Sequence, residues 1–174
     1  MSGLSQLSRA AALPARYRSP PPAAAARSIL RLAQVAAGDC VYDLGCGDGR
    51  ICLAAAKLGA SAVGVEIEPD LARSFSRQIE AQGLGEKVRC VCGDLRELDP
   101  AELERATVLV VYLLPEAIAG LQTRLLECVQ RGARLVCNTW GLVGVAAAGE
   151  TNVADKGATK LWLYTKAGCE KASS

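Results

Sequence analysis

Three glycines and two acids form the stretch of this sequence that points most directly to ligand binding. The glycines stand at positions 45, 47 and 49, with Asp43 before them and Asp48 among them. A short apolar run precedes this stretch and a helical pattern follows it. The glycines are therefore expected at the carboxyl end of a strand, where open α/β sheets bind their ligands. Glycine adopts positive φ and lets the backbone approach a ligand closely, so the pattern predicts a binding loop.

The charge and spacing of this loop favour a cationic ligand. A dinucleotide fingerprint, GxGxxG, requires a glycine at the position that Arg50 occupies. A pyrophosphate bound at the following helix N-terminus would also be repelled by Asp43. The same carboxylate suits an ammonium or a sulfonium group. A nicotinamide oxidoreductase is the weaker alternative.

Two further acids follow the next two predicted strands. Glu66 ends the run 62–66, and Asp94 follows the run 88–92. The first can accept hydrogen bonds from both ribose hydroxyls, and the second from an adenine amino group; such charge-assisted bonds contribute about 1.5–3 kcal/mol each. Glu66 alone does not separate a dinucleotide from a sulfonium nucleoside. The alternative is that these are ordinary turn residues, which is most plausible for Asp94 taken by itself.

The elements that must position these residues alternate along the chain. We expect strands at 40–44, 62–66, 88–92, 107–112, 133–137 and 160–165, and helices at 20–36, 50–58, 69–82 and 115–130. Short apolar strands separated by amphipathic helices indicate an α/β fold with a doubly wound, mostly parallel, Rossmann-like sheet. Only about 20 residues lie between the last two expected strands, too few for a normal strand–helix–strand unit, which predicts an abbreviated C-terminal edge. The expected organisation is one domain over 19–166, with tails at 1–18 and 167–174.

Composition excludes several other classes of protein. The 174 residues are 51% hydrophobic and 22% charged, as in a globular chain. No apolar run approaches the roughly 18 residues that a membrane span needs. Histidine is absent and the eight cysteines form no CxxC pair, so neither a metal site nor a Cys-His or Ser-His-Asp nucleophile is expected. The cysteine spacing predicts free thiols in an intracellular, reducing compartment.

Charge is distributed unevenly along the chain. Residues 1–38 contain five arginines and no acid, while acids exceed bases in the remainder. An acid-free, Arg-bearing N-terminus is typical of an organelle transit peptide. The alternative is a weakly basic leader that has no targeting function. The expected localisation is therefore mitochondrial or cytoplasmic. The net charge of +2 is too small to predict a nucleic-acid partner.

Three of these segments together resemble class I S-adenosylmethionine (SAM)-dependent methyltransferases. They are residues 43–51 (DLGCGDGRI), 63–66 (VGVE) and 93–95 (GDL). The chain is most similar to a group of small proteins with DLGxGDGRI after an N-terminal Y-x-x-P segment, where Tyr17 and Pro20 fall here. That group includes mitochondrial lysine methyltransferases acting on the adenine nucleotide translocase and the ATP synthase c-subunit, and bacterial relatives.

The resemblance implies a role for each matching residue. Asp43 and the glycines would contact the methionine portion of SAM, Glu66 the ribose and Asp94 the adenine. The implied cofactor-binding set is Tyr17, Asp43, Gly45, Cys46, Gly47, Gly49, Glu66, Ile67, Asp94, Leu95 and Tyr112. Tyr112 would lie near the transferring methyl group. Candidates for lining the acceptor channel are Asp48, Tyr112, Asn138 and Trp140, and no general base is assigned.

Two departures from related patterns bear on the methyl acceptor. Residues 112–115 read YLLP where base and amide methyltransferases carry (N/D)PP(Y/F), which disfavours DNA adenine and protein glutamine as acceptors. Residues 138–145 are small and apolar, unlike the aromatic, Pro-containing segment of the lysine-methylating relatives. We predict methyl transfer to a protein lysine. A small-molecule acceptor and a SAM-binding module without catalysis remain alternatives.

Overall fold

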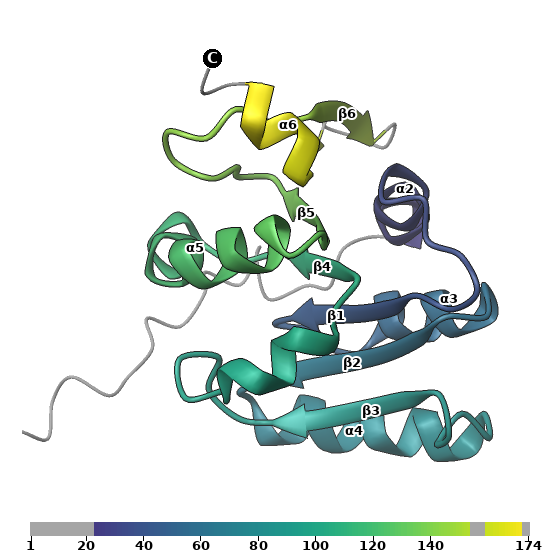
Figure 1. Ribbon diagram of the computed structural model, residues 1–174. Coiled ribbons are helices and arrows are strands. Elements are labelled where there is room, and N and C mark those ends of the chain that lie inside the picture. Colours follow the sequence, from purple (N-terminus) through teal and green to yellow (C-terminus); the bar gives the residue numbers. More distant parts are fainter. Residues whose placement is uncertain (1–22, 154–158, 172–174) are drawn as a thin grey trace, which may run out of the picture.

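The computed structural model describes residues 23–153 and 159–171, and these build one seven-stranded sheet (Figure 1). The strands are β1 (Cys40–Leu44), β2 (Ser61–Glu66), β3 (Val88–Cys92), β4 (Val108–Val111), β5 (Arg134–Asn138), β6 (Gly149–Val153) and β7 (Thr159–Tyr164). Their spatial order is β3-β2-β1-β4-β5-β7-β6. The first five strands are parallel, while β7 runs antiparallel to both of its neighbours. The expected doubly wound, mostly parallel sheet is confirmed.

The order in which strands are added to the sheet reverses at β1. Strand β2 pairs with one side of β1 and β4 with the other. Leu44, at the end of β1, is level with Val65 and with Val111. The carboxyl ends of the parallel strands therefore meet at one edge, toward which the arrowheads of β1 and β3 point in Figure 1. A ligand crevice is expected at such a switch point.

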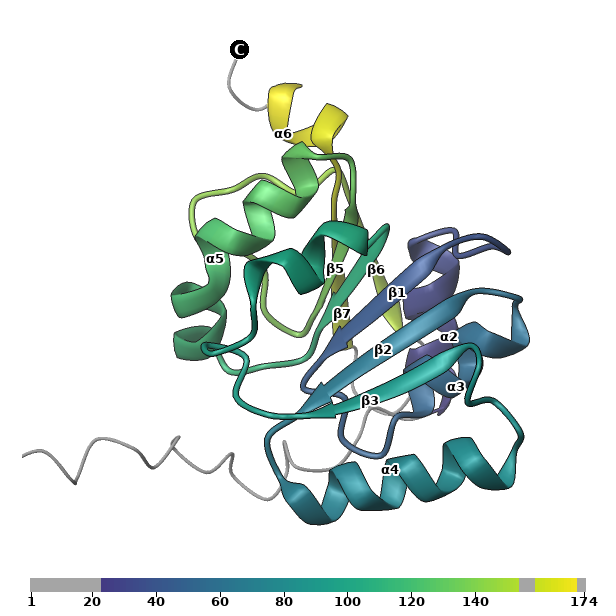
Figure 2. The ribbon, with the colours of Figure 1, turned by 60° about the horizontal axis from the view of Figure 1, so that its bottom comes forward.

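Helices cover both faces of the sheet (Figure 2). They are α2 (Ala23–Leu32), α3 (Arg50–Lys57), α4 (Pro69–Ala81), the 3-10 helix η1 (Pro100–Arg105), α5 (Pro115–Gln130) and α6 (Lys166–Lys171). Successive strand residues point to opposite faces. Val41 thus joins the core under α2, α3 and α4, whereas Tyr42 joins the core under α5 and η1.

The C-terminal third differs from the expectation in three details. Strand β6 was not predicted, because its sequence GETNV lacks an apolar pattern and its side chains are largely exposed at the sheet edge. A loop without helix joins β5 to β6. This connection is the abbreviated part of the edge. Residues 166–171 form α6, in a stretch for which a tail was expected.

At the N-terminal side, α2 ends at Leu32 rather than at residue 36, and the chain then turns into β1. The predicted start of this helix at Pro20 lies outside the described residues. Among the helices that the structure describes, none has the length and apolar character needed to cross a membrane.

Candidate functional site: the carboxyl ends of the strands

The glycine loop between β1 and α3 has a backbone that only glycine tolerates. Gly45, Gly47 and Gly49 all have positive φ, between 56° and 90°. A Cβ on Gly49 would lie 2.0 Å from the ring of Phe75, which is fully buried. Helix α3 begins directly after this residue. The loop is therefore fixed tightly against the core, with its backbone at the sheet edge.

Cys46 packs into the protein rather than toward the edge. Its side chain occupies the space beside Gly64, where an added Cβ would lie 2.6 Å from the Cys46 Sγ atom. Burial is the main reason why the pKa of the Cys46 thiol is raised. Cys46 can contribute to a ligand site only through its backbone, which refines its predicted role as a cofactor-binding residue.

Buried polar side chains gather near the same edge. Among the described residues, the buried polar or charged ones are Asp43, Glu66 and Asn138, each 7% exposed or less. They lie at or next to the carboxyl ends of β1, β2 and β5. Strand alternation also places them on one face of the sheet, the face of α2, α3 and α4. A row of buried polar groups in such a place indicates a ligand site, because buried polar groups are otherwise satisfied within the protein.

Asp43 is the most perturbed acid of this row. Burial, and then the nearby charges of Glu66 and Asp48, raise its pKa to about 7. Its side chain is 2% exposed, and no described group donates a hydrogen bond to its carboxylate. A bound cation beside this carboxylate would supply the partner that the protein itself does not.

Glu66 joins two of the loops at the edge. One carboxylate oxygen accepts a hydrogen bond from the Gly47 amide at 2.7 Å, and the other from the Glu68 amide at 2.9 Å. Each carboxylate oxygen can accept a further bond, so Glu66 can still receive two ribose hydroxyls. Ile67 follows directly and is 47% exposed, which leaves an apolar surface next to the carboxylate.

The remaining acids at the edge are neutralised locally, a feature that the sequence analysis missed. Asp48 forms an ion pair with Arg50 at 2.6 Å. Asp94 forms one with Arg96 at 2.5 Å, and hydrogen bonds from Arg96 are the main reason why the Asp94 pKa is lowered. Asp94 stays ionised and can still accept a hydrogen bond from an adenine amino group.

Helix α5 holds the loops on both sides of the edge, which sequence reasoning also missed. The Arg124 guanidinium donates to the backbone carbonyls of Leu95, at 3.1 Å, and Leu98, at 2.6 Å, in the loop after β3. The Gln122 amide exchanges two hydrogen bonds, of 3.0 and 2.9 Å, with the backbone of Val143 in the loop after β5. No sequence pattern signals such long-range contacts from side chains on a helix.

The other predicted site residues are placed as follows. Tyr112 comes directly after β4, level with Asn138 on the neighbouring strand. Trp140 lies two residues beyond β5 and is partly buried against the core on the α5 face, away from the face of Asp43. Tyr17 lies outside the described residues.

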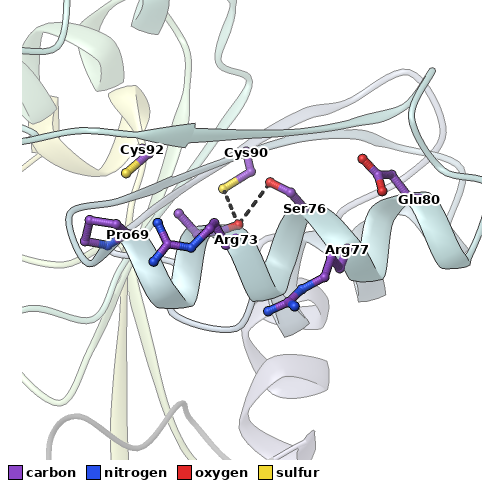
Figure 3. Close-up of a pocket in the computed structure, with 8 residues that line it drawn as sticks. Pro69, Arg73, Ser76, Arg77, Glu80, Cys90 and Cys92 are labelled. Atoms are coloured by element: carbon purple, nitrogen blue, oxygen red, sulfur yellow. Dashed lines mark hydrogen bonds between the residues drawn. The ribbon is translucent and has the colours of Figure 1, made fainter.

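A separate cavity of about 450 Å³ lies along α4 and the edge strand β3 (Figure 3). Arg73 and Arg77 line it from the helix, and Cys90 and Cys92 from the strand. The Ser76 hydroxyl and the Cys90 thiol both donate to the Ala72 carbonyl, at 3.0 and 3.6 Å. These groups are satisfied by the backbone, and the glycine loop does not contribute to the lining.

The sequence model of a family described as the ANTKMT methyltransferase domain matches residues 43–148. This match covers more than half of the chain. The chain belongs to the ANTKMT methyltransferase domain family. The matched region begins at Asp43 and contains the whole edge from the glycine loop to the loop after β5.

Individual relatives of this ANTKMT-family chain are also methyltransferases. A protein-lysine N-methyltransferase of Saccharolobus islandicus is 37% identical over 127 residues, which are 72% of this chain and 77% of that protein. A ribosomal protein L11 methyltransferase of Pasteurella multocida is 33% identical over 116 residues, or 66% of this chain. The match spans only 36% of that longer relative.

A solved structure with the same fold is also a methyltransferase. It is an RNA methyltransferase from Salinibacter ruber in complex with S-adenosyl-L-homocysteine, with a TM-score of 0.77 and 33% identity. The alignment covers 84% of this chain and 93% of that one. The ANTKMT-family chain is a SAM-dependent methyltransferase, as predicted. The unpartnered Asp43 carboxylate and the positive-φ glycine loop fit a cationic nucleoside at the edge.

Proposed function

We propose that this protein transfers a methyl group from SAM to the side chain of a protein lysine. The observation that carries the proposal is the 37% identity to a protein-lysine N-methyltransferase over 77% of that relative. The match covers 72% of this chain and 77% of the relative, which supports a shared kind of acceptor as well as a shared cofactor.

The short loops at the carboxyl edge support a macromolecular acceptor. In the described part of the chain, the connections after β1, β2 and β4 at the carboxyl edge are only a few residues long. These short loops leave the edge open enough for a protein segment to reach the strand ends. Acids also exceed bases outside residues 1–38, which disfavours RNA as the acceptor.

The proposed cofactor site uses three residues of the edge. Asp43 would bind the ammonium or sulfonium charge, Glu66 the ribose hydroxyls, and Asp94 the adenine. Bound SAM supplies an electrophilic methyl group on a positively charged sulfur. The contribution of this chain is alignment, which for a well-oriented pair is worth about 7–11 kcal/mol at most.

The acceptor amine must be neutral to react. Lysine has an ordinary pKa of about 10.4, and a partly desolvated site lowers it because burial disfavours the charged form. Tyr112 and Asn138 stand level at the ends of β4 and β5, and we propose that they line this site. The proton then leaves to solvent, since no described side chain is assigned as a base.

The cofactor part of the proposal is tested by calorimetry on Glu66→Ala. We expect SAM binding to weaken at least tenfold, because the variant removes the ribose acceptor and releases the Gly47 amide. Glu80→Ala, on the exposed side of α4, is the matched control and should bind SAM as the wild type does. Unchanged affinity in Glu66→Ala would remove the ribose assignment.

The acceptor is tested with radiolabelled SAM in a cell lysate that is then separated into protein, RNA and small-molecule fractions. We expect label in protein, bound as methyl-lysine after acid hydrolysis. Label that appears only in RNA or only in small metabolites would refute the lysine proposal, while leaving the methyltransferase assignment intact.

We further propose that the protein works in a reducing compartment and that it is targeted to the mitochondrion. All eight cysteines are free thiols, in support of the first part. The acid-free N-terminal stretch with its five arginines supports the second. The full chain fused at its C-terminus to a fluorescent protein should co-localise with mitochondria. A diffuse cytoplasmic signal would contradict the mitochondrial address.

A further inference from the structure

Asn138 is a largely buried side chain whose amide nitrogen has no hydrogen-bond partner in the described part of the chain. It ends strand β5 and is 1% exposed. Its amide oxygen accepts a hydrogen bond from the Thr139 hydroxyl at 3.3 Å. No hydrogen-bond acceptor for its amide nitrogen lies among the described residues. Among the described side chains only Arg124 Nε is an enclosed polar atom without a partner, so the Asn138 amide nitrogen touches solvent and is open to an acceptor from a ligand.

Thr139, which orients this amide, has a strained backbone. Its φ is +73°, a left-handed conformation that is a genuine outlier for a β-branched residue. Such strain persists only where the surroundings enforce it, and it clusters at functional sites. The Thr139 amide donates to the Lys160 carbonyl at 2.8 Å, and its carbonyl accepts from the Trp162 indole at 3.4 Å.

The C-terminal hairpin supplies these restraints. Lys160 and Trp162 both belong to β7, and the Lys160 ammonium lies 4.0 Å from the centre of the Trp162 ring. Glu150 on β6 forms an ion pair with the same ammonium at 2.8 Å. The hairpin of β6 and β7, grouped with β5 in Figure 2, therefore holds Thr139 in its strained conformation and, through it, the amide of Asn138.

The position of Asn138 separates it from the proposed cofactor site. Strand β4 lies between β5 and β1. Neighbouring strands are about 4.8 Å apart, so β5 lies roughly 10 Å from β1. Val136 is level with Asp43, and Asn138 lies two residues further along β5. Glu66 and Asp94 lie on the opposite side of β1. A ligand bound at β1, β2 and β3 leaves the ends of β4 and β5 for the methyl acceptor.

We infer that Asn138 binds the methyl acceptor, with its side-chain amide, oriented by the strained Thr139, donating a hydrogen bond to a carbonyl or carboxylate oxygen of the acceptor. This inference rests on the proposed methyltransferase function and adds to it the group that positions the acceptor. Asn138 contacts the acceptor itself, whereas Thr139 is a positioning residue that acts through Asn138.

The test compares two affinities in the same variants of the full chain. Calorimetry gives the dissociation constant of SAM, and transfer of label from radiolabelled SAM gives the half-saturating concentration of desalted lysate protein. Asn138→Asp keeps the shape of the side chain but replaces the donor by an acceptor. We expect the half-saturating concentration to rise at least tenfold while the SAM constant stays within twofold. Asn152→Asp, at an exposed position of β6, is the matched control and should change neither value.

Variants of Thr139 distinguish a positioning role from a merely structural one. Thr139→Val keeps the branched shape and loses the hydroxyl, so it should repeat the acceptor defect; Thr139→Ser keeps the hydroxyl and should restore normal binding. Thr139→Gly relieves the strain. We expect its melting temperature to equal or exceed that of the wild type while its acceptor affinity falls.

Two results would overturn the inference. One is an unchanged half-saturating concentration in both Asn138→Asp and Thr139→Val. The other is a parallel loss of SAM affinity, which would make Asn138 a cofactor or structural residue. If Asn138→Asp does not fold, the Thr139 variants decide. A wild-type protein that binds SAM but labels no fraction of the lysate would refute the proposed function, and the inference with it.

Discussion

Asp43 links the stability of this protein to its ligand site, and Asp43→Asn separates the two. The carboxyl is buried, and its pKa is raised from the ordinary value of 3.8 to about 7. Each pKa unit corresponds to 1.36 kcal/mol, so ionised Asp43 destabilises the folded protein by about 4 kcal/mol. Asparagine has nearly the same shape and no charge. We expect Asp43→Asn to be more stable than the wild type by up to about 4 kcal/mol at pH 8.

The pH dependence of this difference has a definite sign. Between pH 4 and 7 the folded state holds a proton on Asp43 that the unfolded state has lost. The contribution of Asp43 to the stability of the wild type should therefore fall through this window as the pH rises, and then level off. The gain in Asp43→Asn should be close to zero at pH 4 and largest above pH 7. Urea denaturation at several pH values measures it, with Asp70→Asn as an exposed control.

The same variant should lose affinity for SAM. A cation bound beside Asp43 favours the ionised carboxylate, so binding should release up to one proton near pH 6.5. Calorimetry in two buffers of different ionisation enthalpy detects this proton. We expect Asp43→Asn to release none and to bind SAM at least tenfold more weakly. A variant that is no more stable at pH 8 and binds SAM as tightly as the wild type would show that Asp43 is neither a strained buried acid nor a contact of the cofactor.

Two further substitutions test the fold around the site. Asp39→Asn should destabilise the protein by about 2 kcal/mol at pH 7. Burial raises the Asp39 pKa, but hydrogen bonds from Thr107 and Ala36 and the ion pair with Arg134 outweigh it, so the pKa is lowered and the ionised carboxylate stabilises the fold. In denaturation at several pH values this loss should vanish as the pH falls through the folded pKa, and a pH-independent loss would contradict the ion-pair explanation. Gly49→Ala should cost about 2–4 kcal/mol, from left-handed strain and overpacking; a melting temperature equal to that of the wild type would show that Phe75 yields easily.

Much of the fold could be predicted because the strands under both layers of helices are short apolar runs. Strand β6 could not, because a polar sequence at a sheet edge carries no hydrophobic pattern. The end of α2 was also placed too late, since Ala-rich residues favour a helix even where the chain turns.

The site was predictable where a residue follows directly from the end of a strand. Asp43 and Glu66 were found in this way, because the carboxyl ends of parallel strands must meet. The hydrogen bonds by which α5 holds the neighbouring loops could not be predicted, because the contact of Arg124 with the loop after β3 depends on tertiary packing. The strained backbone of Thr139 had no signal either, because its conformation is imposed by β7, which follows 20 residues later.

A crevice lined by carboxylates and bare backbone is expected to accept a sulfonium nucleoside and to reject a diphosphate. Crystals of the protein soaked separately with S-adenosylhomocysteine and with NADH test it most directly. We expect the nucleoside across the ends of β1, β2 and β3, with its ammonium at Asp43 and its ribose at Glu66, and no NADH there. NADH in that crevice, with S-adenosylhomocysteine absent, would contradict it.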